Sequence, residues 1–223
     1  MSSSVILSCQ SEGDIEKVCE LASDALKVGG IIVYPTESSY AIGCGIDYKD
    51  SIEKIYQIKN RPHDLIFPLI APDIESLNLI VSNINKIERK LMEEFWPGPL
   101  TILLAANTIA PLSIKGMNNK IAVRISGNII AQRLTLIAGL PIIATSANPS
   151  GQSPALNILD IKRYFDDDSR RATPNRIDMI INGGQCKGGL PSTIVEVIGE
   201  DIRIIREGAI SRGEIAVNGF NVM

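Results

Sequence analysis

The chain of 223 residues lacks most of the short motifs that usually identify a chemistry. It has a single histidine, His63, so a multi-histidine metal site is excluded and a Ser-His-Asp triad would have to use that residue. The four cysteines contain no C-x-x-C pair, which argues against a zinc knuckle or a redox pair. The Walker loop, the G-x-G-x-x-G fingerprint and the G-x-S-x-G elbow are also absent. A bound nucleotide must therefore be held in another way, and an α/β-hydrolase is disfavoured.

Long apolar runs and an excess of positive charge are missing as well. No apolar run approaches the roughly 20 residues that a membrane span needs, and residues 1–4 lack the basic start of a secretory signal. The net charge of -3 argues against a protein that coats duplex nucleic acid, but it leaves room for a local basic cleft. We therefore expect a cytoplasmic protein with no membrane partner.

The apolar residues, 45% of the chain, alternate between helical and strand spacing and can form a sizeable core. Helical spacing covers residues 12–28, 52–58, 72–80, 83–95, 129–138 and 156–165. Strand patterns cover residues 31–34, 40–43, 67–71, 100–105, 121–124, 142–145, 179–181, 193–198 and 202–206. This order predicts one α/β domain with a mixed sheet. We place the domain at residues 12–210, followed by a short C-terminal tail at 211–223.

Hydroxyl side chains lie at the ends of three of the predicted strands. The strand at 142–145 runs into Ser146-Ala147-Asn148, the strand at 31–34 runs into a segment that contains Ser38, and Ser192 precedes the strand at 193–198. Each of these alone is most often a cap or a turn residue. Ligands in open α/β sheets bind at strand ends, so the recurrence favours a binding site.

Two cations, Lys59 and Arg61, stand just before Pro62. Residues at i and i+2 do not share a helix face, but Pro62 disfavours helical geometry at Arg61 and lets the chain leave the helix there. One interpretation is a solvated pair that favours the helix dipole. The other is a phosphate clamp, in which arginine supplies a planar fork and lysine a point charge.

Arg124 and Arg206 each close a strand that looks buried. An unpaired buried charge is costly, so each needs a partner. For Arg124 the alternatives are a structural ion pair with an acid such as Glu37, or a ligand carboxylate or phosphate. Arg206 presents the same choice.

Taken together, the motifs resemble the YrdC-type threonylcarbamoyl-AMP synthase family in its single-domain form. The matching stretches lie between about residues 29 and 208. They are Tyr34-Pro35-Thr36-Glu37-Ser38, Lys59-x-Arg61-Pro62, Trp96-Pro97-Gly98-Pro99, Ala122-Val123-Arg124, Ser146-Ala147-Asn148-x-Ser150-Gly151, Pro191-Ser192-Thr193 and Arg206-x-Gly208-Ala209-Ile210.

The resemblance implies a YrdC-like domain, in which helices flank a twisted open mixed sheet around a central, positively charged cavity. It implies condensation of L-threonine, bicarbonate and ATP to threonylcarbamoyl-AMP and pyrophosphate. Mg²⁺ would bridge the phosphates, with no metal ligand from the protein. A separate transferase complex would then modify tRNA, and tRNA or double-stranded RNA is a further candidate partner.

The resemblance also assigns roles by position. The residues expected to face ATP are Lys59, Arg61, Asn148 and Arg206, with Lys59 and Arg61 as the catalytic pair. The residues expected to hold threonine are Ser38, Arg124, Ser146 and Ser192, with Arg124 on the carboxylate.

The chain departs from the family pattern at several positions. Ser38 replaces a threonine, Ala41 replaces a glycine, Leu65 replaces a polar residue, and residues 125–128 lack the usual prolines. The stretch at 34–67 has YciO-like features, so the alternative is a YciO-like module that binds nucleotide or RNA with little turnover. A third alternative is carbamoyl transfer of the hydrogenase-maturation type, which involves additional domains. Threonine-dependent release of pyrophosphate separates the synthase from the binding module.

Overall fold

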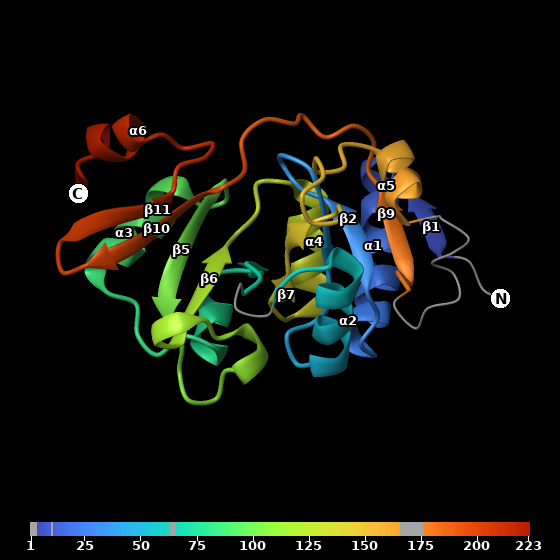
Figure 1. The fold of residues 1–223 in the computed structure, drawn as a ribbon, viewed down its shortest axis with the longest axis horizontal. Coiled ribbons are helices and arrows are strands. Elements are labelled where there is room, and N and C mark those ends of the chain that lie inside the picture. The colour runs from blue at the N-terminus through green and yellow to red at the C-terminus, as the bar shows by residue number, and fades with distance from the viewer. Residues whose placement is uncertain (1–3, 10, 63–65, 166–175) are drawn as a thin grey trace.

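The structure is a computed structural model that describes residues 4–9, 11–62, 66–165 and 176–223. His63, Leu65 and most of the polar segment at 166–176 lie outside these ranges. Two lobes, each built on its own sheet, lie side by side along the long axis of the molecule (Figure 1). The α/β class with twisted mixed sheets and flanking helices is confirmed, and the predicted sheet is divided into two.

The first lobe contains a five-stranded sheet. Its strands, in spatial order, are β1 (Val5–Ser8), β9 (Met179–Asn182), β2 (Ile32–Pro35), β3 (Tyr40–Gly43) and β8 (Thr145–Ser146). The β1, β9 and β2 strands are parallel, whereas β3 is antiparallel to both β2 and β8.

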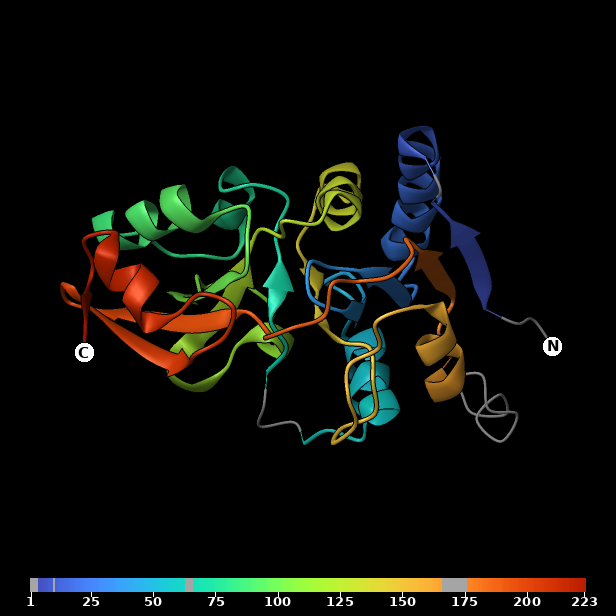
Figure 2. The ribbon, with the colours of Figure 1, turned by 90° about the horizontal axis from the view of Figure 1, so that it is seen from above.

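Helices cover both faces of the first sheet, so its strands β2 and β3 are buried throughout. Ile32 and Tyr34 pack with α1 (Glu12–Lys27) and α4 (Ile129–Ala138), whereas Val33 belongs to the core on the other side. In Figure 2, α2 (Lys49–Lys59) and α5 (Ile158–Phe165) lie opposite α1 and α4. Strand residues that alternate between two apolar layers explain why residues 31–34 read as a continuous apolar run.

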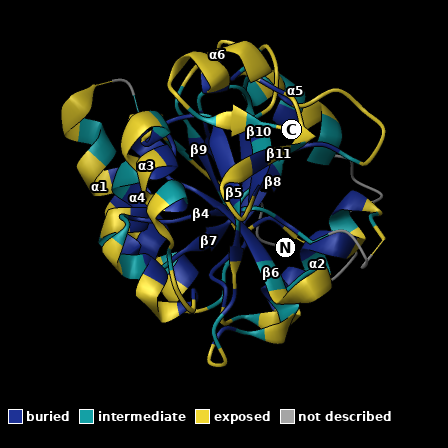
Figure 3. Ribbon diagram, turned by 90° about the vertical axis from the view of Figure 1, so that its left-hand side faces the viewer, coloured by how far each residue is buried: buried dark blue, intermediate teal, exposed yellow. Residues whose placement is uncertain are grey.

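The second lobe contains a seven-stranded sheet. Its strands, in spatial order, are β12 (Asn221–Val222), β11 (Asp201–Arg206), β10 (Thr193–Ile198), β5 (Leu100–Ala105), β6 (Lys120–Arg124), β4 (Leu69–Ile70) and β7 (Ile142–Ile143). The remaining helices are α3 (Lys86–Phe95), α6 (Arg212–Val217) and the 3₁₀ turns η1 (Glu75–Leu79), η2 (Leu112–Ile114) and η3 (Met117–Asn119). The strands at the centre of the molecule are buried, whereas α1, α3 and α6 expose their outer sides (Figure 3).

The two sheets meet where one predicted strand divides. We expected a single strand at 142–145, but β7 pairs with β4 of the second sheet and β8 pairs with β3 of the first. Ala144 lies between them and donates its backbone N–H to the carbonyl of Pro68 at 2.8 Å. The division turns the chain so that Ser146 emerges at the junction of the two lobes.

Besides the turns η2 and η3, three short elements near the chain ends were not predicted from the sequence. The β1 strand precedes residue 12 and pairs with β9, and residues 211–223 form α6 and then β12, which extends the second sheet beside β11. Ile215 of α6 is fully buried. Elements of two to six residues are too short to show a clear period, so pairing rather than pattern determines them. None of the helices in the described ranges is long and apolar enough to cross a bilayer.

Gly43 permits the close approach of the two sheets. A Cβ at this position would lie only 1.8 Å from the carbonyl oxygen of Ile143. We predict that Gly43→Ala lowers the free energy of unfolding by about 3 kcal/mol, because strand backbone rather than a flexible side chain would have to move. Denaturant titration followed by circular dichroism measures the effect.

The matched control for this substitution is Gly13→Ala on the exposed side of α1. A Cβ at Gly13 meets only the Ser11 hydroxyl, at 3.9 Å. This variant should gain about 0.5–1 kcal/mol from reduced unfolded-state entropy. Equal stabilities for the two variants would contradict the proposed role of Gly43.

Candidate functional site

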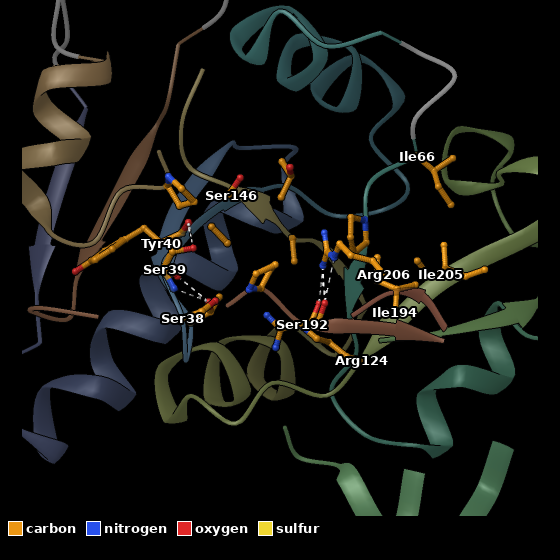
Figure 4. Close-up of a pocket in the computed structure, with 18 of the residues that line it drawn as sticks. Ser38, Ser39, Tyr40, Ile66, Arg124, Ser146, Ser192, Ile194, Ile205 and Arg206 are labelled. Carbon is orange, nitrogen blue, oxygen red and sulfur yellow. Dashed lines mark hydrogen bonds between the residues drawn. The ribbon is translucent and has the colours of Figure 1, made fainter. Parts of the chain in front are cut away.

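A cavity of about 730 Å³ lies between the two sheets. Elements of both lobes line it, including the loop after β2, the end of β6, the start of β8 and the segment before β10. Six of the eight predicted site residues are on its wall: Ser38, Arg61, Arg124, Ser146, Ser192 and Arg206. Figure 4 shows Ser38 and Ser146 on the side of the first lobe, facing Arg206 and Ser192 on the side of the second.

Strand register explains which side chains of the second sheet reach the cavity. On β6, Ala122 and Arg124 line it, whereas the intervening Val123 packs in the core. Leu103 of β5 is the register partner of Ala122 and faces the same way. Because side chains alternate along a strand, one face of this sheet supplies the cavity wall and the other supplies the core.

A bulge brings an additional side chain to this wall. On β10 and β11, Ile194 pairs with Arg206 but Val195 pairs with Ile204, so the register shifts by one residue. As a result Ile205 and Arg206, although adjacent in sequence, both line the cavity. Together with Leu103 and Ile194, Ile205 forms an aliphatic surface beside the cationic one.

The charged side chains on the described cavity wall are all cationic. They belong to Arg61, Lys120, Arg124 and Arg206. Burial, and then the charges of Arg61 and Arg124, lower the pKa of Arg206. Since like charges held close together repel, an anionic ligand would relieve this repulsion.

Arg206 is held by neutral oxygen acceptors. Its guanidinium donates to the carbonyl of Ser192 at 2.7 Å and to the Ser192 hydroxyl at 3.2 Å (Figure 4). Thr101 donates its own hydroxyl to that of Ser192 at 2.9 Å. The positive charge of Arg206 therefore stays uncompensated by these contacts, while its orientation is set.

For Arg124 the ion-pair interpretation is confirmed, and its role in binding a ligand stays a prediction. Arg124 forms an ion pair with Glu37, from the loop after β2, and it also lines the cavity. The second oxygen of Glu37 accepts a hydrogen bond from the Ser126 hydroxyl at 2.6 Å. Burial by itself would raise the pKa of Glu37, but the Arg124 charge and the Ser126 hydrogen bond outweigh it, so this pKa lies below its usual value. Glu37 is therefore ionised at neutral pH.

Lys59 and Asn148 lie behind the wall rather than on it. The α2 helix ends at Lys59, and Asn60 takes the left-handed conformation, so Arg61 turns into the cavity. The Lys59 side chain is only 2% exposed and donates to the carbonyls of Ser146 and Asn148, and to the Asn148 side-chain oxygen at 3.5 Å. The two cations of the predicted clamp therefore lie in different places. Arg61 is on the cavity wall, whereas Lys59 binds the segment that carries Ser146.

The ammonium form of Lys59 suits this position. Burial, followed by the nearby charge of Arg61, lowers the pKa of Lys59 to about 8. Its three oxygen acceptors match the three donors of a protonated amine. The backbone carbonyl of Lys59 also accepts from the N–H of Ser150 at 2.9 Å, so one residue holds both ends of the 146–150 segment.

Sequence reasoning missed Lys120 and the glycines of the crossover from β9 to β10. Lys120 stands four residues before Arg124, so the period of two already placed both on one face of the strand. Gly188 and Gly189 line the cavity with positive φ, and Gly188 donates its N–H to the carbonyl of Ser38 at 3.0 Å. The two adjacent glycines were the available signal for this backbone conformation.

We predict that Lys59→Met destabilises the fold by about 2–3 kcal/mol, because buried oxygens of Ser146 and Asn148 lose their donor. The control is Lys49→Met, at the exposed start of the same helix, which should change stability little. Thermal unfolding of the two variants measures the difference. If both melt like the wild type while Lys59→Met loses nucleotide binding, Lys59 contacts ligand instead.

The comparisons with known proteins agree on one family. The Sua5/YciO/YrdC family model, described as "Telomere recombination", matches residues 24–208. The threonylcarbamoyl-AMP synthase of Marinobacter nauticus is 32% identical over 179 residues, which are 80% of this chain and 90% of that protein. The protein of the same name from Nitrosococcus oceani is 34% identical over 78% of this chain and 90% of its own length.

Several solved structures share the fold at 25% identity or more, including those of P. abyssi Sua5 and E. coli YciO. The P. abyssi Sua5 structure complexed with L-threonine has a TM-score of 0.86 and 25% identity, and this chain covers 63% of that protein's length. The E. coli YciO structure has a TM-score of 0.79 and 27% identity, covering 94% of this chain and 97% of that one. The cavity therefore belongs to a recurrent fold, and the chain is a member of the Sua5/YciO/YrdC family.

Proposed function

We propose that this protein is an L-threonylcarbamoyladenylate synthase, a nucleotidyltransferase that condenses L-threonine, bicarbonate and ATP to threonylcarbamoyl-AMP and pyrophosphate. The observation that carries the proposal is a cavity between two sheets whose charged wall residues are cationic and whose other polar residues are mostly hydroxyls. The synthases of Marinobacter nauticus and Nitrosococcus oceani, and the threonine complex of P. abyssi Sua5, support it.

The chemistry asks the protein mainly for placement and charge. The threonine amine combines with bicarbonate to form a carbamate and water. A carbamate oxygen then attacks the α-phosphorus of ATP, and the bond to pyrophosphate breaks. Phosphoryl transfers of this kind depend on positioning and on neutralising the charge of the phosphates. A deep cavity also protects the carbamate, which water decomposes.

The wall residues divide these tasks. Arg206 is suited to the triphosphate, because its hydrogen bonds to the carbonyl and hydroxyl of Ser192 leave its charge uncompensated. Arg61 lies on the same cavity wall and is assigned to the triphosphate with it. Arg124 is suited to the carboxylate of threonine. Ser38 and Ser146 supply hydroxyls across the cavity, and Ser192 joins them from the second lobe. In this proposal Lys59 and Asn148 act by holding the segment at 146–150.

Mg²⁺ would enter with ATP rather than through a protein site. The described residues contain no cluster of three metal-ligating side chains, and no carboxylate is among the described residues of the cavity wall. When bound, Mg²⁺ neutralises phosphate charge. The arginines and hydroxyls of the chain orient the phosphates beside it.

The product implies the partners. Threonylcarbamoyl-AMP is a reactive mixed anhydride, so we propose that a tRNA-modifying threonylcarbamoyl transferase complex consumes it in the cytoplasm. Direct binding of tRNA or double-stranded RNA is a further proposal, and the cations of the cavity wall are the candidate contacts. The alternative function is that of a YciO-like binding module, which the similarity to E. coli YciO favours.

The deciding experiment measures pyrophosphate release from ATP and bicarbonate by the purified chain, with and without L-threonine. The synthase predicts release that depends on threonine and is weaker with serine. A folded protein that binds ATP without any release would instead support the binding module. RNA binding that is lost with salt, without turnover, would point the same way.

Paired arginine variants test the division of the wall. We predict that Arg124→Gln raises the KM for threonine about tenfold or more and changes the KM for ATP less than about twofold, since one charge-assisted carboxylate contact is lost. Arg206→Gln should do the reverse. Steady-state kinetics with each substrate varied in turn measures both constants.

The control for both variants is Arg133→Gln, which removes a surface arginine that pairs with Glu16 outside the cavity. It should leave both constants unchanged. If Arg124→Gln and Arg206→Gln raise the same constant, the proposed division between carboxylate and phosphates is wrong.

A further inference from the structure

The cavity has to bind two kinds of anion, which differ greatly in charge, at different positions. In the proposed reaction, threonine presents a single carboxylate, whereas ATP and the product pyrophosphate carry several negative charges. Arginines bind both chemical groups well. Several cations lie on one wall, so geometry alone does not prevent a phosphate from occupying the amino-acid position.

Arg124 differs from Arg206 in the charge of its partner. Glu37 places a full carboxylate on the Arg124 guanidinium, whereas Arg206 rests on the carbonyl and hydroxyl of Ser192. Among the described residues, no acid forms a salt bridge with Arg206. One arginine is therefore nearly neutral as a unit, and the other keeps its charge.

The Glu37 carboxylate is itself fixed in place. One oxygen binds Arg124 and the other accepts the Ser126 hydroxyl at 2.6 Å. The Ser126 hydroxyl accepts from the backbone N–H of Asn128, and the Gln132 side chain donates to the Ser126 carbonyl at 2.6 Å. Asn128 caps α4, so the start of a helix anchors the pair.

The position of Glu37 links the two lobes. It belongs to the loop after β2 of the first sheet, whereas Arg124 ends β6 of the second. Arg124 is 8% exposed and still contributes to the cavity wall. A second anion at Arg124 would therefore lie close to a fixed, ionised carboxylate in a largely buried pair, where like charges repel strongly.

From this arrangement we infer that Glu37 is a specificity-determining residue, which reserves Arg124 for a monovalent carboxylate by repelling polyphosphates. The inference rests on the proposed function, in which threonine and ATP share the cavity. Repulsion grows with the charge of the ligand, so one carboxylate tolerates a second far better than it tolerates pyrophosphate. The directional N–H donors of Arg124 still bind the amino acid.

The test uses calorimetric titration of the whole chain with L-threonine and with inorganic pyrophosphate, separately and together. In the wild type, saturating threonine should leave the affinity for pyrophosphate unchanged, because the two occupy different arginines. In Glu37→Gln, pyrophosphate should compete with threonine, and its affinity at that position should rise about tenfold. Thermal unfolding first establishes that each variant is folded.

Two control variants separate charge from orientation. Ser126→Ala removes one hydrogen bond to Glu37 but keeps the charge of the Glu37 carboxylate. Threonine should therefore bind several-fold more weakly, while pyrophosphate still does not compete with it. Glu16→Gln removes an arginine-paired carboxylate outside the cavity and should behave like the wild type. If the role of Glu37 were purely structural, Glu37→Gln would bind both threonine and pyrophosphate more weakly.

A folded Glu37→Gln protein with wild-type behaviour toward pyrophosphate would overturn the inference. Competition between the two ligands in the wild type would do so as well, and this arm decides the question if Glu37→Gln does not fold. A wild type that binds pyrophosphate but no threonine would instead overturn the proposed function. The pyrophosphate affinity of Glu37→Gln would then still report on the repulsion.

Discussion

The structure depends on the point where the chain passes from β7 in one sheet to β8 in the other. The chain leaves one sheet and enters the other within residues 142–146, and the backbone N–H of Ile143 donates to the carbonyl of Cys44 at 2.9 Å. Gly43 allows this approach because it has no Cβ. The junction joins the two sheets beside the cavity and places Ser146 on the cavity wall, so the site follows from this passage of the chain.

The second constraint on this molecule is the repulsion among the cations of the cavity wall. A wall that carries three arginines and a lysine gathers cations whose repulsion opposes folding. The protein offsets part of it with Glu37 on Arg124 and with Glu196 on Lys120, and leaves Arg206 to neutral acceptors. The pattern of compensation, more than the number of cations, distinguishes the places that suit a carboxylate from those that suit phosphates.

Burial separates two cations that stand close together in the sequence. Lys59 and Arg61 were expected to form one clamp, yet the left-handed Asn60 sends their side chains to different places. The Lys59 ammonium finds three protein oxygens and becomes part of the scaffold, whereas Arg61 remains on the cavity wall. A lysine with all three donors engaged holds in place the loop that supplies the acceptors.

The sequence by itself determined the α/β class and most element positions, because the local patterns at residues 100–105, 129–138 and 193–198 match β5, α4 and β10. It indicated the family through the resemblance of its motifs. It also indicated six residues that line the cavity, since hydroxyls and arginines at strand ends, and a cation before a proline at a helix end, are local patterns. The division of the sheet at Ala144 and the pairing of β1 and β12 depended on contacts distant in sequence. Which side chain Lys59 or Arg124 contacts was likewise decided only in the tertiary structure. The physical reason is that periodicity reports which face of an element is buried, whereas a partner is chosen by what packing brings within hydrogen-bond distance.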